Sequence, residues 1–210
     1  MSNRTIQTGL RDLGYSPGAI DGLFGPQTQT AAEAWIAAAG KPAAAVPSGD
    51  LPWMTEARRV LGRHEVRDNG WLRSWLKSDG RTLGDPAKLP WCGDFVETCI
   101  RLALPTEPFP GALGQNPYWA RNWLELGERT AVTYGAVLVF ERGSGGHVGF
   151  AVGADAACYH VLGGNQSNAV TIARMERKRL LGARWPKSFA ARPISLPTLS
   201  ANAAISKNEA

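Results

Sequence analysis

The 210-residue sequence has few of the residues that build disulfide frameworks or metal sites. It contains three cysteines and three histidines, the cysteines form no CxxC pair, and no histidine falls at a familiar metal-ligand spacing from them. Cys92 and Cys99, if they share a helix, lie about 10 Å apart along its axis, beyond the ~7 Å limit between Cα atoms in a disulfide. We therefore expect free thiols, no metal site and no cofactor.

Long apolar segments are also missing. No run approaches the ~20 residues of a membrane span. The first residues, MSNRTIQTGLRDLGY, lack the basic start, apolar core and cleavage site of a secretory signal. We expect a protein that is not embedded in a membrane and that stays in the cytoplasm until something else releases it.

The composition is that of a soluble globular protein, with 44% hydrophobic and 20% charged residues. The net charge of +5 favours an acidic partner, such as nucleic acid, an anionic membrane surface or an anionic cell wall, and charge alone does not choose among them. The densest basic run, residues 174–187, is interpreted as a solvated face in preference to a half-buried element. Eight tryptophans are many for this length; most are expected in the core, although such a number also suits stacking against sugars.

Residues 1–40 predict a small helical module. Apolar residues keep helical spacing over residues 6–13, and after a turn-rich connection Pro26 begins a second helix. The stretch LRDLGYSPGAIDGLFGPQTQTAAEAW resembles the peptidoglycan-binding module of many cell-wall hydrolases, whose hallmark is GY followed by DGxFGxxT before a helix ending in an aromatic. The resemblance implies bacterial peptidoglycan as the partner, with Asp21 and Phe24 among the binding residues.

The rest of the chain divides into three parts. Residues 41–52 are rich in Pro, Ala, Gly and Ser without periodicity, which is typical of a linker. Residues 53–187 are predicted to form the second domain, and we expect the protein to be a monomer. The tail, residues 188–210, has little pattern, and we expect it to be extended or mobile.

The second domain carries helical patterns first and strand patterns afterwards. Helices are expected over residues 52–62, 69–80, 90–103 and 118–126, and strands over residues 136–140, 147–153, 157–164 and 169–174. Because the strands follow one another closely, we predict an α+β fold with an antiparallel sheet.

Three residues of this domain fit a cysteine hydrolase, which needs a thiolate, an imidazole and a polar group that orients the imidazole. Cys92 follows Pro90 in the first turn of a predicted helix, where the helix dipole favours a thiolate. His147 opens a strand after the glycine-rich GSGG, which leaves room for a substrate. Asn165 ends the next strand and is placed to fix the imidazole tautomer, with Gln166 as the rival for that third position.

Four blocks, PWCGDFVE, GHVGFAVG, VLGGNQSNAV and RLLGARWP, occur in that order within the second domain. Together they resemble a phage and prophage branch of the CHAP hydrolases, which are cysteine- and histidine-dependent amidohydrolases and peptidases with a papain-like core. The resemblance implies a papain-like (CHAP/NlpC-type) fold in which Cys92 is the nucleophile, His147 the base and Asn165 the third member. Residues implied to contact the substrate are Trp91, Gly146 and Gln166.

Two acidic residues border these blocks. Asp94 stands beside the proposed nucleophile, and we expect its charge to raise the pKa of the thiol. Glu65 either borders the cleft or forms an ion pair with a nearby arginine. The other cysteines, Cys99 and Cys158, are expected in the core.

Taken together, both halves of the chain indicate a peptidoglycan hydrolase of the phage endolysin type that cuts an amide bond. CHAP enzymes include endopeptidases and N-acetylmuramoyl-L-alanine amidases, and we favour endopeptidase. One alternative is a catalytically inactive cell-wall-binding protein. A nucleic-acid binder is motivated only by the charge and predicts DNA affinity that falls steeply with salt; we expect no nucleic-acid partner.

Overall fold

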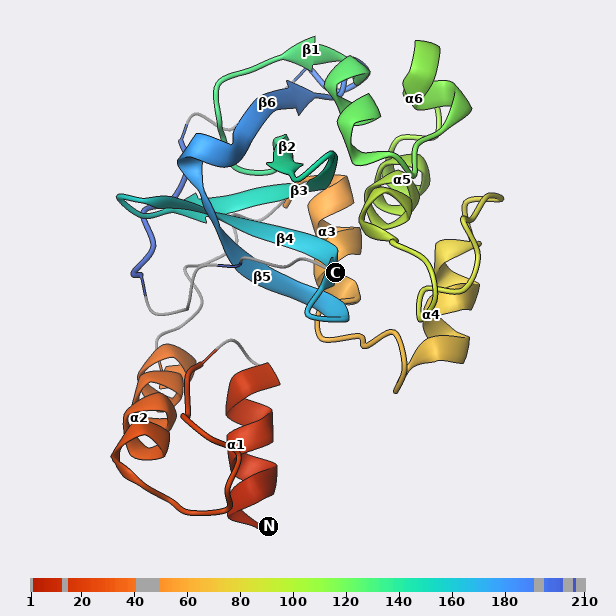
Figure 1. Ribbon diagram of the computed structural model, residues 1–210. Helices are drawn as coiled ribbons and strands as arrows, with labels where there is room; N and C mark the ends of the chain where they lie inside the picture. The colour runs from red at the N-terminus through yellow and green to blue at the C-terminus, as the bar shows by residue number, and fades with distance from the viewer. Residues whose placement is uncertain (1, 13–14, 41–49, 191–194, 202–205, 207–210) are drawn as a thin grey trace. The chain divides into compact units, whose positions relative to one another are not determined.

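The computed structural model describes residues 2–12, 15–40, 50–190, 195–201 and 206 (Figure 1). Of the predicted linker, residues 41–49 lie outside this description. The contacts divide the chain after Asp50 into an N-terminal unit and a second unit that begins at Leu51. None of the described helices is both long enough and apolar enough to cross a membrane.

The N-terminal unit consists of α1 (Asn3–Asp12), α2 (Pro26–Gly40) and the loop between them. The side chain of Gln7 is buried between these parts, with 1% of its surface exposed. Its amide oxygen accepts a hydrogen bond from the backbone N–H of Gly22 at 2.8 Å. Its amide nitrogen lies within hydrogen-bond distance of Ala19 O, Asp21 Oδ1, Leu23 O and Thr28 Oγ1. A single buried amide therefore fixes the loop of a unit with a small apolar core.

The second unit has the predicted α+β architecture. Its helices are α3 (Pro52–Arg59), α4 (Asn69–Leu76), α5 (Cys92–Ala103), α6 (Gly111–Gln115) and the 3-10 helices η1 (Ala120–Glu125) and η2 (Arg177–Arg179). Its strands are β1 (Glu128–Arg129), β2 (Val137–Arg142), β3 (Gly145–Ala154), β4 (Cys158–Gln166), β5 (Ala169–Glu176) and β6 (Leu180–Trp185). They form one sheet in the order β1-β6-β2-β3-β4-β5, with every neighbouring pair of strands antiparallel.

Helix α5 packs on this sheet against β3 and β4 (Figure 1). Its apolar residues recur at helical spacing, and Phe95, Val96 and Ile100 are fully buried. The ring of Phe95 lies 6.0 Å from that of Phe150 on β3, measured between ring centroids. Because the middle of α5 is held in the core, the first turn of the helix has a fixed place beside the start of β3.

The basic run at residues 174–187 is the predicted solvated face only in part: Arg177, Lys178 and Lys187 are exposed, whereas other residues of the run are buried. Arg174 is buried and pairs with Asp155 at 2.7 Å, so its charge is neutralised inside the sheet. Farther along, alternate residues Ala183 and Trp185 of β6 are buried, which is the two-residue period of a strand with one buried face. Most of this segment is therefore part of the sheet.

The expected mobile tail, residues 188–210, is also partly anchored. The indole of Trp185 donates a hydrogen bond to the carbonyl of Phe189 at 2.7 Å. Farther along, the backbone of Ala154 at the end of β3 exchanges hydrogen bonds with residues 197–199 at 2.9 and 2.8 Å. The parts of the tail outside the described residues are 191–194, 202–205 and 207–210.

Candidate active site

Cys92 opens α5, as predicted, with only 4% of its surface exposed. Burial raises the pKa of its thiol, while hydrogen bonds from the backbone N–H groups of Val148 and Gly93 act in the opposite direction. Burial outweighs the donors at the helix start, so the pKa of the thiol lies above its ordinary value and is not lowered as the helix dipole alone would predict. A base must therefore remove the thiol proton when the sulfur reacts.

The fold brings the start of β3 to this thiol. The backbone N–H groups that act on the Cys92 sulfur include that of Val148 as well as that of Gly93. The N–H of Val148 belongs to the peptide bond between His147 and Val148. His147 is itself fully buried. Cys92 and His147 are 55 positions apart in the sequence. They are neighbours at the site because α5 packs on β3.

His147 is held by the amide of Gln166. Its Nε2 lies 3.0 Å from Gln166 Oε1. The amide nitrogen of Gln166 donates to the carbonyl of Thr171 at 2.6 Å and lies 3.2 Å from that of Val161, which turns the amide oxygen toward the imidazole. An oxygen acceptor at Nε2 requires the proton on that nitrogen, so a neutral imidazole keeps its lone pair on Nδ1, the atom suited to accept a proton from a thiol.

Asn165, the first choice for the third position, lies in a different setting. It has a φ of 57°, in the left-handed region that Asn tolerates better than most residues. It sits where the pairing register of β4 and β5 shifts between Gly163 and Gln166, an irregularity that redirects the side chains that follow. The structure thus brings the rival, Gln166, to His147.

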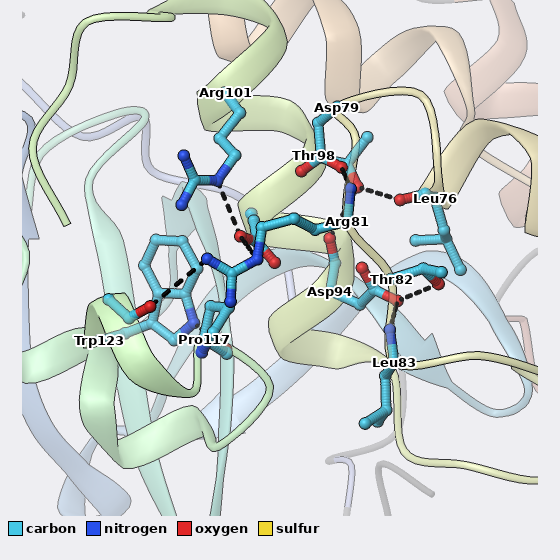
Figure 2. Close-up of polar contacts among 12 residues, drawn as sticks. Leu76, Asp79, Arg81, Thr82, Leu83, Asp94, Thr98, Arg101, Pro117 and Trp123 are labelled. Carbon is cyan, nitrogen blue, oxygen red and sulfur yellow. Dashed lines mark hydrogen bonds and ion pairs between the residues drawn. The ribbon is translucent and has the colours of Figure 1, made fainter. Parts of the chain in front are cut away.

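Asp94 is buried in the first turn of α5, with 1% of its surface exposed. Its Oδ2 accepts hydrogen bonds from the backbone N–H of Leu83 at 2.9 Å and from the Thr82 hydroxyl at 3.1 Å (Figure 2). Its Oδ1 is buried without a hydrogen-bond partner among the described residues. Burial raises the pKa of Asp94 to about 7. The raised pKa of the Cys92 thiol, which we expected from the charge of Asp94, is caused mainly by burial. The carboxyl of Asp94 instead holds residues 82–83 to α5.

Glu65 supports the site through Trp91. Its Oε2 accepts a hydrogen bond from the Trp91 indole at 2.8 Å, whereas nearby arginines pair with Asp68. Trp91 is only 1% exposed, and a Cβ on Gly164 would lie 2.5 Å from its ring. Trp91, predicted as a substrate contact, is therefore packed in the core behind the site.

The segment 117–121 contacts both sides of the site and was not singled out in the sequence. A Cβ on Gly93, next to Cys92, would meet the carbonyl of Pro117 and lie 2.9 Å from the Tyr118 backbone. On the histidine side, Arg121 donates a hydrogen bond to the carbonyl of Gly145 at 2.6 Å. A Cβ on Gly146, a predicted substrate contact, would lie 3.1 Å from Arg121 Cγ. The glycines next to Cys92 and His147 were the signal in the sequence that another segment packs closely against both residues.

In the N-terminal unit, the two predicted binding residues differ in setting. Asp21 Oδ1 accepts hydrogen bonds from the Gln7 side chain and from the Leu23 backbone. Both bonds lower the pKa of Asp21, and the bond from Gln7 has the larger effect. The side chain of Asp21 thus stabilises the conformation of the loop between α1 and α2. Phe24 is 48% exposed and open to a ligand. A hollow of about 310 Å³ is lined by Ser16, Gly18, Pro26, Gln27 and Thr30.

The remaining thiols and acids show no sign of a metal centre. Cys99 and Cys158 are buried, as predicted. In the described part of the chain, no three His, Cys, Asp or Glu side chains are grouped to hold a metal ion, and the three cysteines are free.

Comparison with known families gives one match. Residues 3–35 match the family described as "Putative peptidoglycan binding domain". The match covers α1, the loop fixed by Gln7 and most of α2, and it supports a peptidoglycan-binding module at the N-terminus and association with the cell wall. Searches of curated proteins and of solved structures found no match.

Proposed function

We propose that this protein is a peptidoglycan hydrolase that cuts an amide bond of the bacterial cell wall with Cys92 as nucleophile. The observation that carries the proposal is the meeting of three groups: a thiol at a helix start, the peptide bond of His147 at its sulfur, and Gln166 on the imidazole. This arrangement, on helices followed by an antiparallel sheet, supports a papain-like domain of the CHAP type. The N-terminal module would keep the hydrolase at its polymeric substrate.

The first half of the reaction forms a thioester. His147 Nδ1 takes the proton of the Cys92 thiol while the sulfur attacks the amide carbonyl carbon, and the C=O electron pair moves to the oxygen. Backbone N–H groups at the start of α5 stabilise that oxyanion. When the carbonyl re-forms, the C–N bond breaks, and the proton on His147 goes to the leaving nitrogen.

The second half consumes one water. His147 takes a proton from a water molecule while the water oxygen attacks the thioester carbonyl carbon. Collapse of the new tetrahedral intermediate then breaks the C–S bond. The sulfur leaves and regains its proton from His147. The products are a carboxylic acid and an amine. Throughout, the Gln166 oxygen favours the imidazolium form by accepting a hydrogen bond from its Nε2–H group.

The four sequence blocks that resemble phage and prophage CHAP enzymes support a role as an endolysin. In that role the protein stays in the host cytoplasm until a lesion in the membrane releases it, and then acts on the wall in the periplasm. The net charge of +5 favours its approach to an anionic wall.

Mass spectrometry of fragments released from purified sacculi tests the proposal. We expect the wild type and Cys99→Ala, which changes the other thiol of α5, to release fragments, and Cys92→Ser to release none. Release by Cys92→Ser at the wild-type rate would show that the nucleophile is another group. If the wild type binds sacculi and releases nothing, the alternative of an inactive wall-binding protein is correct.

A further inference from the structure

Trp119 is an exposed tryptophan beside the proposed site. Its surface is 48% exposed, and within the described part of the chain no cation or second ring stacks on it. Trp71 provides a contrast: it is 38% exposed, but the Arg63 guanidinium lies 4.2 Å from its ring centroid. Trp119 thus presents a bare indole surface to solvent, which offers a ligand a large and flat apolar contact area.

The position of this indole is tied to the reactive pair. Its Cη2 lies 3.9 Å from the place of a Cβ on Gly145, two residues before His147. Its carbonyl accepts a hydrogen bond from the backbone of Asn122 at 2.9 Å. Arg121, two residues after Trp119, donates a hydrogen bond to the carbonyl of Gly145, so the backbone that follows the indole is held against the start of β3. A flat surface held in place before a ligand arrives loses little entropy on binding.

Peptidoglycan offers one group that matches such a surface. Its glycan strands consist of pyranose rings with apolar C–H faces, which stack on indoles. Its stem peptides consist of small and charged residues without a flat apolar group. An exposed indole beside the site of an enzyme that acts on this polymer is therefore best matched by a sugar ring.

We propose that Trp119 binds the muramic acid ring and thereby directs Cys92 to the amide between the lactoyl group and the first residue of the stem peptide. This inference rests on the proposed function and replaces the endopeptidase preference drawn from the sequence. The lactoyl carbonyl is joined to the sugar through a short ether link. Each further peptide bond lies up to about 3.5 Å farther along the stem. A sugar ring on Trp119 would lie beside Gly145, two residues before His147. Its position therefore favours cleavage of the first amide, which is the one nearest to the sugar. Cys92 then forms the lactoyl thioester, and the free N-terminus of the peptide leaves.

Two synthetic substrates separate this role from a structural one: an N-acetylmuramoyl dipeptide and the matching N-lactoyl dipeptide without the sugar. For Trp119→Ala we expect KM on the sugar substrate to rise about tenfold, with kcat within about twofold, because an aromatic stack is lost. We expect no change on the lactoyl dipeptide. Trp119→Phe should restore most of the affinity, and Trp71→Ala, the matched control with its ring covered by Arg63, should behave as wild type.

Equal losses on both substrates would overturn the role of Trp119. Fragments from sacculi that are cut inside the peptide, in a reaction that needs Cys92, would overturn the inference and leave the proposed function intact. A wild type that cuts neither the small substrates nor sacculi would overturn the proposed function itself. As a measurement independent of activity, N-acetylmuramic acid added to full-length Cys92→Ala should shift the NMR signal of the Trp119 indole N–H, assigned by its loss in Trp119→Phe; an unmoved signal would also overturn the inference.

Discussion

At the scale of single residues, the amide of Gln166 is hydrogen-bonded to the imidazole of His147. The carbonyls of Thr171 and Val161 accept hydrogen bonds from the amide nitrogen of Gln166. These bonds orient the side chain so that its amide oxygen faces His147. Asn165 shares the sequence block but sits in the left-handed turn of the irregularity. The two neighbours therefore carry separable roles, one in orienting the imidazole and one in shaping the backbone.

Substitution of these neighbours tests that division. Gln166→Leu removes the acceptor of the Nε2 proton, and we expect kcat on sacculi to fall about 100-fold or more because the wrong tautomer becomes available. Asn165→Gly keeps the positive φ without strain, and we expect a loss of no more than a few-fold. Thermal unfolding of both variants checks that they fold. A larger loss in Asn165→Gly than in Gln166→Leu would return Asn165 to the third position.

The buried carboxyl of Asp94 predicts a pH dependence of stability. Its pKa is about 7 in the folded chain against 3.8 for an ordinary aspartate, so the folded state holds a proton that the unfolded state has lost. The free energy of unfolding therefore falls as pH rises from about 4 to about 7, and the penalty is complete above that range. Asp94→Asn mimics the protonated form. We expect its melting temperature relative to wild type to be higher at about pH 8 than at about pH 5, and a pH-independent difference would contradict this.

At the scale of helices and strands, regular apolar spacing made α5, β3 and β4 predictable, and these elements carry the proposed nucleophile and base. The sequence could not give the third residue with certainty, because a register shift changes which side chain faces the imidazole. Strand β6 was missed for another reason: its short apolar alternation directly follows the basic residues Arg177–Arg179, so the whole run was interpreted as a solvated face. Likewise, α6 is too short to produce a helical pattern.

The close approach of β4 to the site gives a prediction at this scale. A Cβ on Gly163 would lie 2.7 Å from Gln166 Oε1 and 3.2 Å from His147 Nε2. Gly163→Ala should therefore push the pair apart and lower kcat at least about tenfold, since a displacement of about 1 Å already costs a catalytic group much of its effect. Gly70→Ala in α4, where no atom lies within 4 Å of the new Cβ, is the control and should leave kcat unchanged. Equal activity of the two variants would mean that the His147–Gln166 contact is not needed.

At the scale of the whole molecule, the peptidoglycan-binding match and the proposed catalytic residues lie in different units. The residues proposed for chemistry all lie in the unit that begins at Leu51, and the match to a peptidoglycan-binding family lies in the other. A module that holds an enzyme on an insoluble polymer raises the effective concentration of the bonds within reach without altering the site. The two units should thus contribute to different kinetic parameters.

Variants of the N-terminal loop test this separation in the full-length chain. Gln7→Ala removes the buried amide that fixes the loop, and we expect binding to sacculi and the rate of sacculus lysis at low enzyme concentration to fall about tenfold or more. Cleavage of a soluble muramoyl dipeptide should stay within about twofold of wild type, because that substrate is too small to use the module. Gln29→Ala changes a glutamine whose visible side-chain bond is to Glu33 on the surface of α2, and as the matched control it should retain both activities. If Gln7→Ala impairs the two substrates equally, the N-terminal unit supports the fold of the second unit, and its contribution is not one of tethering.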